Sequence, residues 1–194
     1  MLREKLKGYS VILASGSPRR QQFFKELDLD FEIRLKEVEE IYDETLEAEA
    51  ITNYLAELKA NAFTEELSEK DILVTSDTIV WHEGKALGKP KDYQDAFQMI
   101  ASLSGKTHEV ITSVCIRTKS KTDTFYEVTK VTFNVLRDDE IRYYLDHYKP
   151  FDKAGSYGIQ EWIGLVAIAR IDGSYANVVG LPVDKVYQHL LTFV

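Results

Sequence analysis

The fold can be inferred first from residues 11–20, which read VILASGSPRR. The apolar run at the start of this segment predicts a strand that is buried on both faces. Pro18 suits the first position of a helix, where its missing N–H costs nothing. A strand that enters a helix through Ser15-Gly16-Ser17 leaves several backbone N–H groups at the helix N-terminus, and these favour an anion. The segment therefore predicts a strand–turn–helix unit that can hold phosphate.

The two arginines that follow Pro18 support the same interpretation. The guanidinium groups of Arg19 and Arg20 present paired N–H donors that match phosphate oxygens. The alternative is a solvated helix start with two surface arginines. Taken alone, this segment is consistent with both interpretations.

Strands and helices alternate through the rest of the chain. We expect strands at 10–14, 31–35, 72–80, 110–117 and 128–136, and a hairpin of 162–171 with 175–179 through Asp172-Gly173. Helices are expected at 18–27, 47–67, 92–103, 138–147 and 182–193, with Asp92 as an N-cap. The order predicts an α/β fold with a mixed, twisted central sheet and flanking helices, in a single domain over residues 1–194.

Composition and charge exclude some functions. The chain has 194 residues, 44% of them apolar, and a net charge of −8, which argues against nucleic acid as a partner. A small anionic ligand remains compatible, because a local basic pocket can exist in an acidic protein. No apolar stretch approaches the ~20 residues of a membrane span, and residues 1–7 lack a signal-peptide apolar region. The single cysteine, Cys115, predicts a core residue in a reducing compartment.

Asp77 is the best candidate for a catalytic group. The polar residues 75–78 interrupt a strand that is otherwise apolar, and a carboxylate in such a place needs partners. Metal binding or general-base chemistry would provide the reason for it, and the alternative is a structural Asp that caps a turn or pairs with a lysine. Lys59 is the second anomaly, since it shares a helix face with Ile51 and Leu55. Its alternative is a packed stem with the ammonium group in water.

Several other segments are weak signals on their own. Gly88-Lys89-Pro90 presents a lysine on a tight loop, and residues 152–160 form a glycine-bearing polar loop. Ser104–Thr107 resembles the end of a P-loop, but the position five residues before Gly105 is Ile100 rather than glycine. The four histidines show no spacing typical of zinc ligands.

Together, these segments resemble the Maf family of nucleoside triphosphate pyrophosphatases along nearly the whole chain. The motifs that carry the resemblance are residues 15–20 (SGSPRR), 39–40 (EE), 58–60 (LKA), 76–80 (SDTIV), 88–90 (GKP), 104–108 (SGKTH) and 152–160 (DKAGSYGIQ). The last motif and Thr78 resemble the subfamily that acts on dTTP and UTP. Ser76 departs mildly from the family pattern, where Ala or Gly is frequent. The resemblance implies an elongated, two-lobe, ITPase-like fold with the nucleotide in a central cleft.

The resemblance also implies a role for each candidate residue. It implies that Asp77 is the proton acceptor and that Glu40 and Asp77 hold a divalent cation, Mg²⁺ or Mn²⁺. It places the specificity determinants on Arg19, Thr78 and Gln160. The full set of residues expected to bind substrate is Ser15, Ser17, Arg19, Arg20, Lys59, Thr78, Lys89 and Gln160.

The implied reaction is hydrolysis of dTTP and UTP, and of modified pyrimidine nucleotides, to the monophosphate and pyrophosphate. The implied role is house-cleaning of the nucleotide pool in the cytoplasm, with a link to cell-division arrest. We expect a small-molecule nucleoside triphosphate as partner, no nucleic acid and no membrane, and we leave a homodimer open. Two alternatives remain: a pyrophosphatase for purine variants such as ITP, and a nucleotide-binding regulator of cell division with little turnover.

Overall fold

The computed structural model describes residues 1–194, which group into two compact units. Unit 1 comprises residues 1–77, 112–127 and 180–194, and unit 2 comprises residues 78–111 and 128–179. The prediction of a single domain is not tested by this division and stays a prediction.

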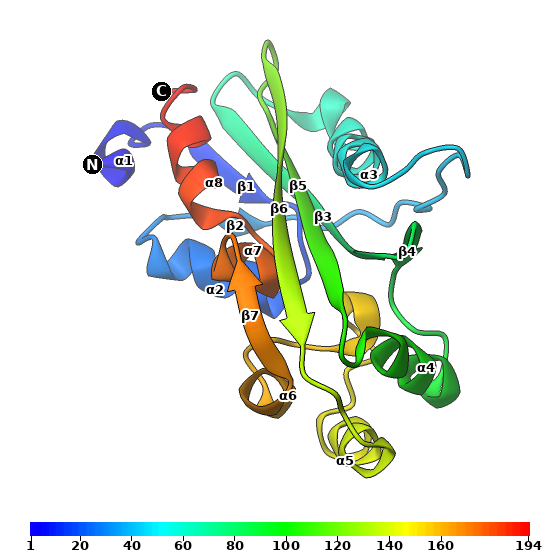
Figure 1. Ribbon diagram of the computed structural model, residues 1–194. Helices are drawn as coiled ribbons and strands as arrows, with labels where there is room; N and C mark the ends of the chain where they lie inside the picture. The colour runs from blue at the N-terminus through cyan, green and yellow to red at the C-terminus, as the bar shows by residue number, and fades with distance from the viewer. The chain divides into compact units, whose positions relative to one another are not determined.

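The helices and strands alternate as expected (Figure 1). The helices are α1 (Leu2–Lys5), α2 (Pro18–Glu26), α3 (Glu49–Asn61), α4 (Tyr93–Leu103), α5 (Asp138–Tyr148), α6 (Trp162–Val166), α7 (Tyr175–Val179) and α8 (Val183–Leu190), with 3₁₀ turns η1 (Thr64–Glu66) and η2 (Ala154–Ser156). The strands are β1 (Ser10–Leu13), β2 (Glu32–Ile33), β3 (Asp71–His82), β4 (Lys85–Leu87), β5 (Thr107–Arg117), β6 (Thr122–Phe133) and β7 (Ile168–Asp172).

The strands form one mixed sheet in the order β2-β1-β3-β5-β6-β7, with β4 paired to β3. The β1 strand pairs in parallel with β2 and β3, whereas β4 and β7 run antiparallel to their neighbours. The predicted α/β fold with a mixed central sheet and flanking helices is therefore confirmed.

In unit 1, helices cover both faces of the sheet, and successive side chains of β1, β3 and β5 pack alternately against the two helical layers. Ile12, Leu73 and Cys115 pack against α3 on one face. Their neighbours along the same strands pack with α1, α2 and α8 in the other apolar cluster. Figure 1 shows α3 on one side of these strands and α2 and α8 on the other. Both faces are buried because successive side chains of a strand point in opposite directions. The expectation that Cys115 is a core residue is confirmed, since it is fully buried with a free thiol.

Unit 2 has a core of its own, built by α4, α5 and α6 on the strand residues of this unit. Helix α4 begins as predicted, because the Asp92 carboxylate accepts a hydrogen bond of 2.8 Å from the Asp95 N–H. Tyr144 is the largest fully buried side chain of α5, and Ile163 is the buried residue of α6.

The predicted hairpin through Asp172-Gly173 is wrong. Residues 162–166 form helix α6, β7 then pairs antiparallel with β6, and residues 175–179 form helix α7. The burial pattern explains α6, since Ile163 and Ala167 are buried at a spacing of four while Leu165 is exposed. Residue Asn177 anchors α7, because its amide donates to Val110 O and Thr129 Oγ1, each at 3.0 Å.

The expected interruption of the strand at residues 75–78 is also wrong, because β3 continues without a break from Asp71 to His82. The polar side chain of Thr75 is accommodated in the core by a hydrogen bond of 2.7 Å to Ala56 O on α3. A buried hydroxyl with a backbone partner is compatible with a continuous strand. Other boundaries shift modestly, and the helix expected at 47–67 ends at Asn61 before η1.

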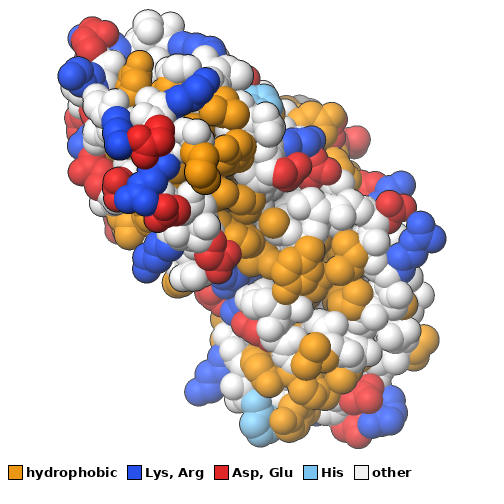
Figure 2. Space-filling view, turned by 90° about the vertical axis from the view of Figure 1, so that its left-hand side faces the viewer, with side chains coloured by type: hydrophobic (Ala, Val, Ile, Leu, Met, Phe, Trp, Pro, Cys, Tyr) orange, Lys and Arg blue, Asp and Glu red, His pale blue; other side chains and the backbone are white.

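On the face drawn in Figure 2, acidic and basic side chains are interspersed. None of the helices is long and apolar enough to cross a membrane.

Candidate active site

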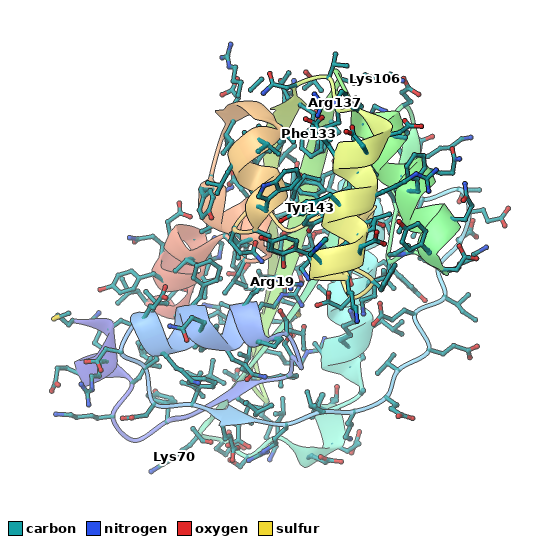
Figure 3. The ribbon with its side chains drawn as sticks, turned by 90° about the horizontal axis from the view of Figure 1, so that it is seen from below. Arg19, Lys70, Lys106, Phe133, Arg137 and Tyr143 are labelled. Atoms are coloured by element: carbon teal, nitrogen blue, oxygen red, sulfur yellow. The ribbon has the colours of Figure 1, made fainter.

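The turn between β1 and α2 has the predicted strand–turn–helix geometry. Pro18 occupies the first turn of α2, and Ser17 is the N-cap residue, although its side chain does not cap the helix. Ser15 is buried, and its Oγ accepts a hydrogen bond of 3.3 Å from the Ser17 N–H. Arg19 is the second residue of α2 and is half-buried (Figure 3). The turn thus places two serines and an arginine at the N-terminal end of α2, where the helix dipole favours an anion.

Arg20 holds this turn to two other segments of unit 1. Its Nε donates to Gly180 O at 2.9 Å, and its Nη1 donates to Ser76 O at 2.9 Å and to Ser15 Oγ at 3.4 Å. Burial lowers the pKa of the guanidinium, and the charge of Asp77 opposes that shift. Arg20 is therefore not a solvated surface arginine, and it fixes the start of α2 beside the middle of β3.

Lys59 of α3 lies between two carboxylates. Its Nζ is 2.7 Å from Asp77 Oδ1 and 3.0 Å from Glu40 Oε1. The Lys59 side chain is 19% exposed, Asp77 is 10% exposed and Glu40 is 49% exposed. The ammonium group is therefore paired with two carboxylates rather than directed into water, which disagrees with the alternative interpretation of Lys59 as a packed stem with a solvated ammonium group. Glu40 belongs to the loop that leads from β2 to α3, and this loop brings it to the same ammonium group as Asp77.

The residues of this cluster fit a hard divalent cation only in part. Glu40 and Asp77 offer carboxylate oxygens, the donors that Mg²⁺ and Mn²⁺ prefer. No group of three or more His, Cys, Asp or Glu residues in the chain is arranged to hold a metal ion. Mg²⁺ is commonly bound by one or two carboxylates together with substrate phosphates and water. The pair therefore fits a cation that arrives with a polyphosphate rather than one held by the protein alone.

Three predicted substrate residues lie on adjoining segments of unit 2. Thr78 is half-buried on β3, whereas Lys89 and Gln160 are exposed on loops. The Lys89 loop and the Gln160 loop are joined by a hydrogen bond of 3.0 Å from Gly155 N–H to Gly88 O. Gly155 also packs on Val80 of β3, with its φ at +66°, and a Cβ built there would lie 2.7 Å from Val80 Cγ2.

The structure thus gathers the predicted residues into two groups. Unit 1 brings together the turn with Ser15 and Ser17, the arginines Arg19 and Arg20, and the Glu40–Lys59–Asp77 cluster. Unit 2 brings together the segments of Thr78, Lys89 and Gln160. The sequence interpretation missed the backbone oxygens of Ser76 and Gly180, which have no signal in residue type. It also stopped one residue short of Glu161, because the polar loop singled out from the sequence ends at residue 160.

Comparison with known proteins supports the resemblance found in the sequence. Residues 10–193 match the family model described as Maf-like protein. A protein of Flavobacterium johnsoniae named dTTP/UTP pyrophosphatase is 66% identical over 194 residues, which cover 100% of both chains. Proteins of the same name from Flavobacterium psychrophilum and Christiangramia forsetii are 64% and 54% identical, and the matches cover 98% of this chain and 98% and 97% of theirs.

Two solved structures have weaker likeness to this chain. The Ham1 protein of Staphylococcus aureus is 14% identical with a TM-score of 0.47, over 64% of this chain and 71% of that chain. A nucleoside-triphosphatase / dITP/XTP pyrophosphatase of Mycobacterium abscessus is 12% identical with a TM-score of 0.46, over 95% and 97%.

Proposed function

This chain belongs to the Maf-like protein family, and we propose that it hydrolyses dTTP and UTP to the nucleoside monophosphate and pyrophosphate. The structural observation that carries the proposal is the continuous set of contacts in unit 1. Arg20 donates to Ser76 O, the next residue Asp77 pairs with Lys59, and Lys59 pairs with Glu40. An anion site at a helix start therefore adjoins a nearly buried carboxylate, which is the combination that phosphoanhydride hydrolysis needs.

The proposed reaction is attack of water on the α-phosphorus. Asp77 accepts a proton from the water, the new bond forms between the water oxygen and the α-phosphorus, and the α,β-bridging oxygen leaves with pyrophosphate. Lys59 fixes Asp77 Oδ1 in one orientation through its hydrogen bond of 2.7 Å. Phosphoryl chemistry of this kind depends mainly on positioning and on neutralising charge, and Arg19, Lys59 and Lys89 carry the positive charge for that task.

Glu40 and Asp77 would hold the divalent cation, Mg²⁺ or Mn²⁺, together with phosphate oxygens of the substrate. When bound, such a cation neutralises phosphate charge and lowers the pKa of a bound water. Because Lys59 pairs with both carboxylates, it limits their mutual repulsion when no other cation is near them.

We assign nucleobase discrimination to Thr78 and Gln160, with Arg19 as a further determinant. The edge of a uracil or thymine ring offers carbonyl acceptors and one N–H donor. A glutamine amide can pair with both kinds of group, and a threonine hydroxyl can donate or accept. The relatives named above favour dTTP and UTP over the purine alternative, and modified pyrimidine nucleotides belong to the same substrate class.

The test is a panel of UTP, dTTP, CTP, GTP and ITP with the products identified by ³¹P NMR. We expect pyrophosphate and the monophosphate from UTP and dTTP, with activity lost on chelation and restored by Mg²⁺ or Mn²⁺. Orthophosphate as the first product would indicate a γ-phosphatase and contradict the proposal. A preference for ITP would indicate the purine alternative, and tight binding without turnover would indicate a regulator.

The setting of this reaction is part of the proposal. We place the protein in the cytoplasm as a house-cleaning enzyme of the nucleotide pool, which its single, buried and free Cys115 supports. A link to cell-division arrest follows the family resemblance. A homodimer stays a prediction, which light scattering at several protein concentrations would test.

A further inference from the structure

The loop that carries Gln160 rests on a polar network inside unit 2. The Glu161 carboxylate is its centre, since Tyr144 of α5 donates its hydroxyl hydrogen to Oε2 and Lys153 Nζ lies 3.2 Å from Oε1. The Tyr144 hydroxyl oxygen in turn accepts a hydrogen bond of 3.0 Å from the Gly158 N–H. A helix is thereby connected through one hydroxyl to two positions of the loop, on either side of Gln160.

The members of this network are poorly exposed. The side chain of Lys153 is 10% exposed and that of Glu161 is 19% exposed, while Tyr144 is fully buried. Burial together with the hydrogen bond to Glu161 raises the pKa of Tyr144, so the hydroxyl remains a donor over the working pH range. Polar groups with this degree of burial hold a defined geometry, because losing one partner leaves another group unsatisfied.

Gly158 brings the network into contact with Gln160 itself. A Cβ built on Gly158 would lie 2.9 Å from Gln160 Nε2 and 2.9 Å from Glu161 Cδ. The amide of Gln160 and the carboxylate of Glu161 therefore lie against the same face of Gly158. A hydrogen bond of 3.0 Å from Glu161 N–H to Gly158 O closes the turn around Gln160.

Gln160 is the exposed residue at the end of this anchored loop, because residues 155–159 before it are all buried. A glutamine side chain on a free loop has many rotamers to lose when it binds a ligand. A glutamine that is held in place reads hydrogen-bonding groups more sharply, because a misplaced donor or acceptor gains little.

We propose that Glu161, held by Tyr144 and Lys153, is a positioning residue that sets the amide of Gln160 for reading the nucleobase. This inference rests on the proposed function, in which Gln160 contacts the base. Glu161 itself touches no substrate in this scheme and acts through the Gly158 turn. Its removal should therefore weaken discrimination between bases more than it weakens the hydrolytic step.

The experiment compares kcat/KM for UTP, dTTP, GTP and ITP in the parent and in Glu161→Ala, Glu161→Gln and Tyr144→Phe. We expect the preference for UTP over GTP to fall about tenfold in Glu161→Ala, the size expected when a base-reading contact is misplaced. Glu161→Gln keeps an acceptor for the Tyr144 hydroxyl and should lose less. In a Gln160→Ala background, Glu161→Ala should change the preference no further, because the two residues act as one unit.

The matched controls are Asp172→Asn and Tyr143→Phe. Asp172 pairs with Arg170 on β7 in an exposed ion pair, and Tyr143 precedes Tyr144 but is exposed and stacks on His147. The Tyr143 ring also packs on Trp162, which the phenylalanine ring can still do. Neither side chain has a hydrogen bond or ion pair with the Gly158 turn, and both variants should keep the base preference of the parent. An equal fall of all four substrates in Glu161→Ala would overturn the proposal, as would an unchanged preference.

A second measurement does not depend on activity. The side-chain amide signals of Gln160, assigned by their loss in Gln160→Ala, should shift and broaden in Glu161→Ala and Tyr144→Phe and stay unchanged in Asp172→Asn. If the parent does not hydrolyse UTP or dTTP, the proposed function fails while these signals still decide the positioning role. Unchanged signals in Glu161→Ala would overturn the positioning role even in an active enzyme.

Discussion

Lys59 Nζ lies 2.7 Å from Asp77 Oδ1, and this pair joins α3 to the middle of β3. The pair is mostly buried, in contrast to exposed pairs such as Arg170 with Asp172. Removing one partner of a buried pair leaves an uncompensated charge, whereas an exposed pair contributes little. The ion pair of Asp77 with Lys59 therefore contributes to the stability of unit 1 and also fixes the carboxylate that acts in the proposed reaction.

Replacement of Asp77 by asparagine should nearly abolish kcat while the chain stays folded. The amide keeps the shape of the side chain and an acceptor for Lys59, but it cannot take a proton and is a poorer metal ligand. We expect a loss on the order of 10²–10³-fold in kcat for UTP, the size typical for removal of one catalytic group. Pyrophosphate release gives the rate, and circular dichroism checks the fold.

Asp71→Asn is the matched control for this prediction, because Asp71 begins the same strand. Asp71 is buried and accepts a hydrogen bond of 2.9 Å from the Ser68 N–H, which an amide oxygen can also accept. Its activity should equal that of the parent. If Asp77→Asn retained activity within about tenfold of the parent, Asp77 would not be the proton acceptor.

Arg20→Ala should destabilise the protein as well as weaken substrate binding. The substitution leaves Gly180 O and Ser76 O without their guanidinium donor, and an unsatisfied buried acceptor costs about 1–3 kcal/mol. Urea unfolding should show a loss of that order, whereas Arg3→Ala, which removes an exposed partner of Asp28, should change the unfolding free energy by less than about 1 kcal/mol. An Arg20→Ala variant as stable as the parent would mean that these two hydrogen bonds contribute nothing to folding.

Arg20 also illustrates how far sequence reasoning reaches. The strand–turn–helix of residues 11–20 can be inferred from residue types and periodicity, whereas a lysine partner for Asp77 is only one of the alternatives that the sequence leaves open. The backbone oxygens that Arg20 binds cannot be inferred, because every residue has a carbonyl and only the fold selects which ones meet. The same reason explains why the surroundings of Lys59 were not predictable, since Glu40 reaches it through a loop without regular structure.

The two wrong expectations have a common origin in short segments. The apolar residues at the start of segment 162–171 are compatible with either a strand or a helix. The burial of both Ile163 and Ala167, four residues apart, is the pattern of the helix α6. In β3, the polar residues 75–78 indicate an interruption of the strand expected at 72–80, although Ala56 O on α3 satisfies the hydroxyl of Thr75. Contacts with residues distant in the sequence determine whether such short segments form a strand or a helix, and the local sequence pattern carries no information on those contacts.

Gly164→Ala should be strongly destabilising. A Cβ built on Gly164 would lie 1.7 Å from Ile159 O and 2.6 Å from Ile159 C, so the backbone of α6 or of the preceding loop must move. Overpacking of this kind costs about 1–3 kcal/mol, and the involvement of backbone places the expected loss at or above the upper end.

Gly88→Ala serves as the control in the same urea titration. Nothing lies within 4 Å of a Cβ built on Gly88, so the free energy of unfolding should stay within about 0.5 kcal/mol of the parent. Equal stability of the parent and Gly164→Ala would show that α6 does not pack closely enough on Ile159 to exclude a methyl group.

His108 should make stability depend on pH between about 6.5 and 3. Burial, together with a smaller contribution from the charge of His82, lowers the pKa of this imidazole from 6.5 to about 3. Its Nε2 lies 2.8 Å from the Tyr157 hydroxyl, and its Nδ1 is buried without a hydrogen-bond partner, so the second proton that makes the ring a cation has no favourable place in the folded chain.

The sign follows from the two protonation states. Between pH 3 and pH 6.5 the unfolded chain carries a proton on His108 and the folded chain does not, so acid favours unfolding. The stabilising contribution of the neutral ring is complete above pH 6.5 and is lost as the pH falls toward 3. Its slope approaches about 1.4 kcal/mol per pH unit in the middle of that range.

His108→Gln removes this titration and keeps a polar side chain near Tyr157. The variant should be less stable at neutral pH, but its free energy of unfolding should fall less steeply with acid than that of the parent. Urea unfolding at pH 6.5, 5.5 and 4.5 gives the change of unfolding free energy with pH for both proteins. The carboxylates titrate in both proteins, so their contribution cancels when one slope is subtracted from the other. His147→Gln, at an exposed position of α5, should keep the parent's slope. Identical slopes for the parent and His108→Gln would mean that the buried ring takes up its proton as readily as it does in the unfolded chain.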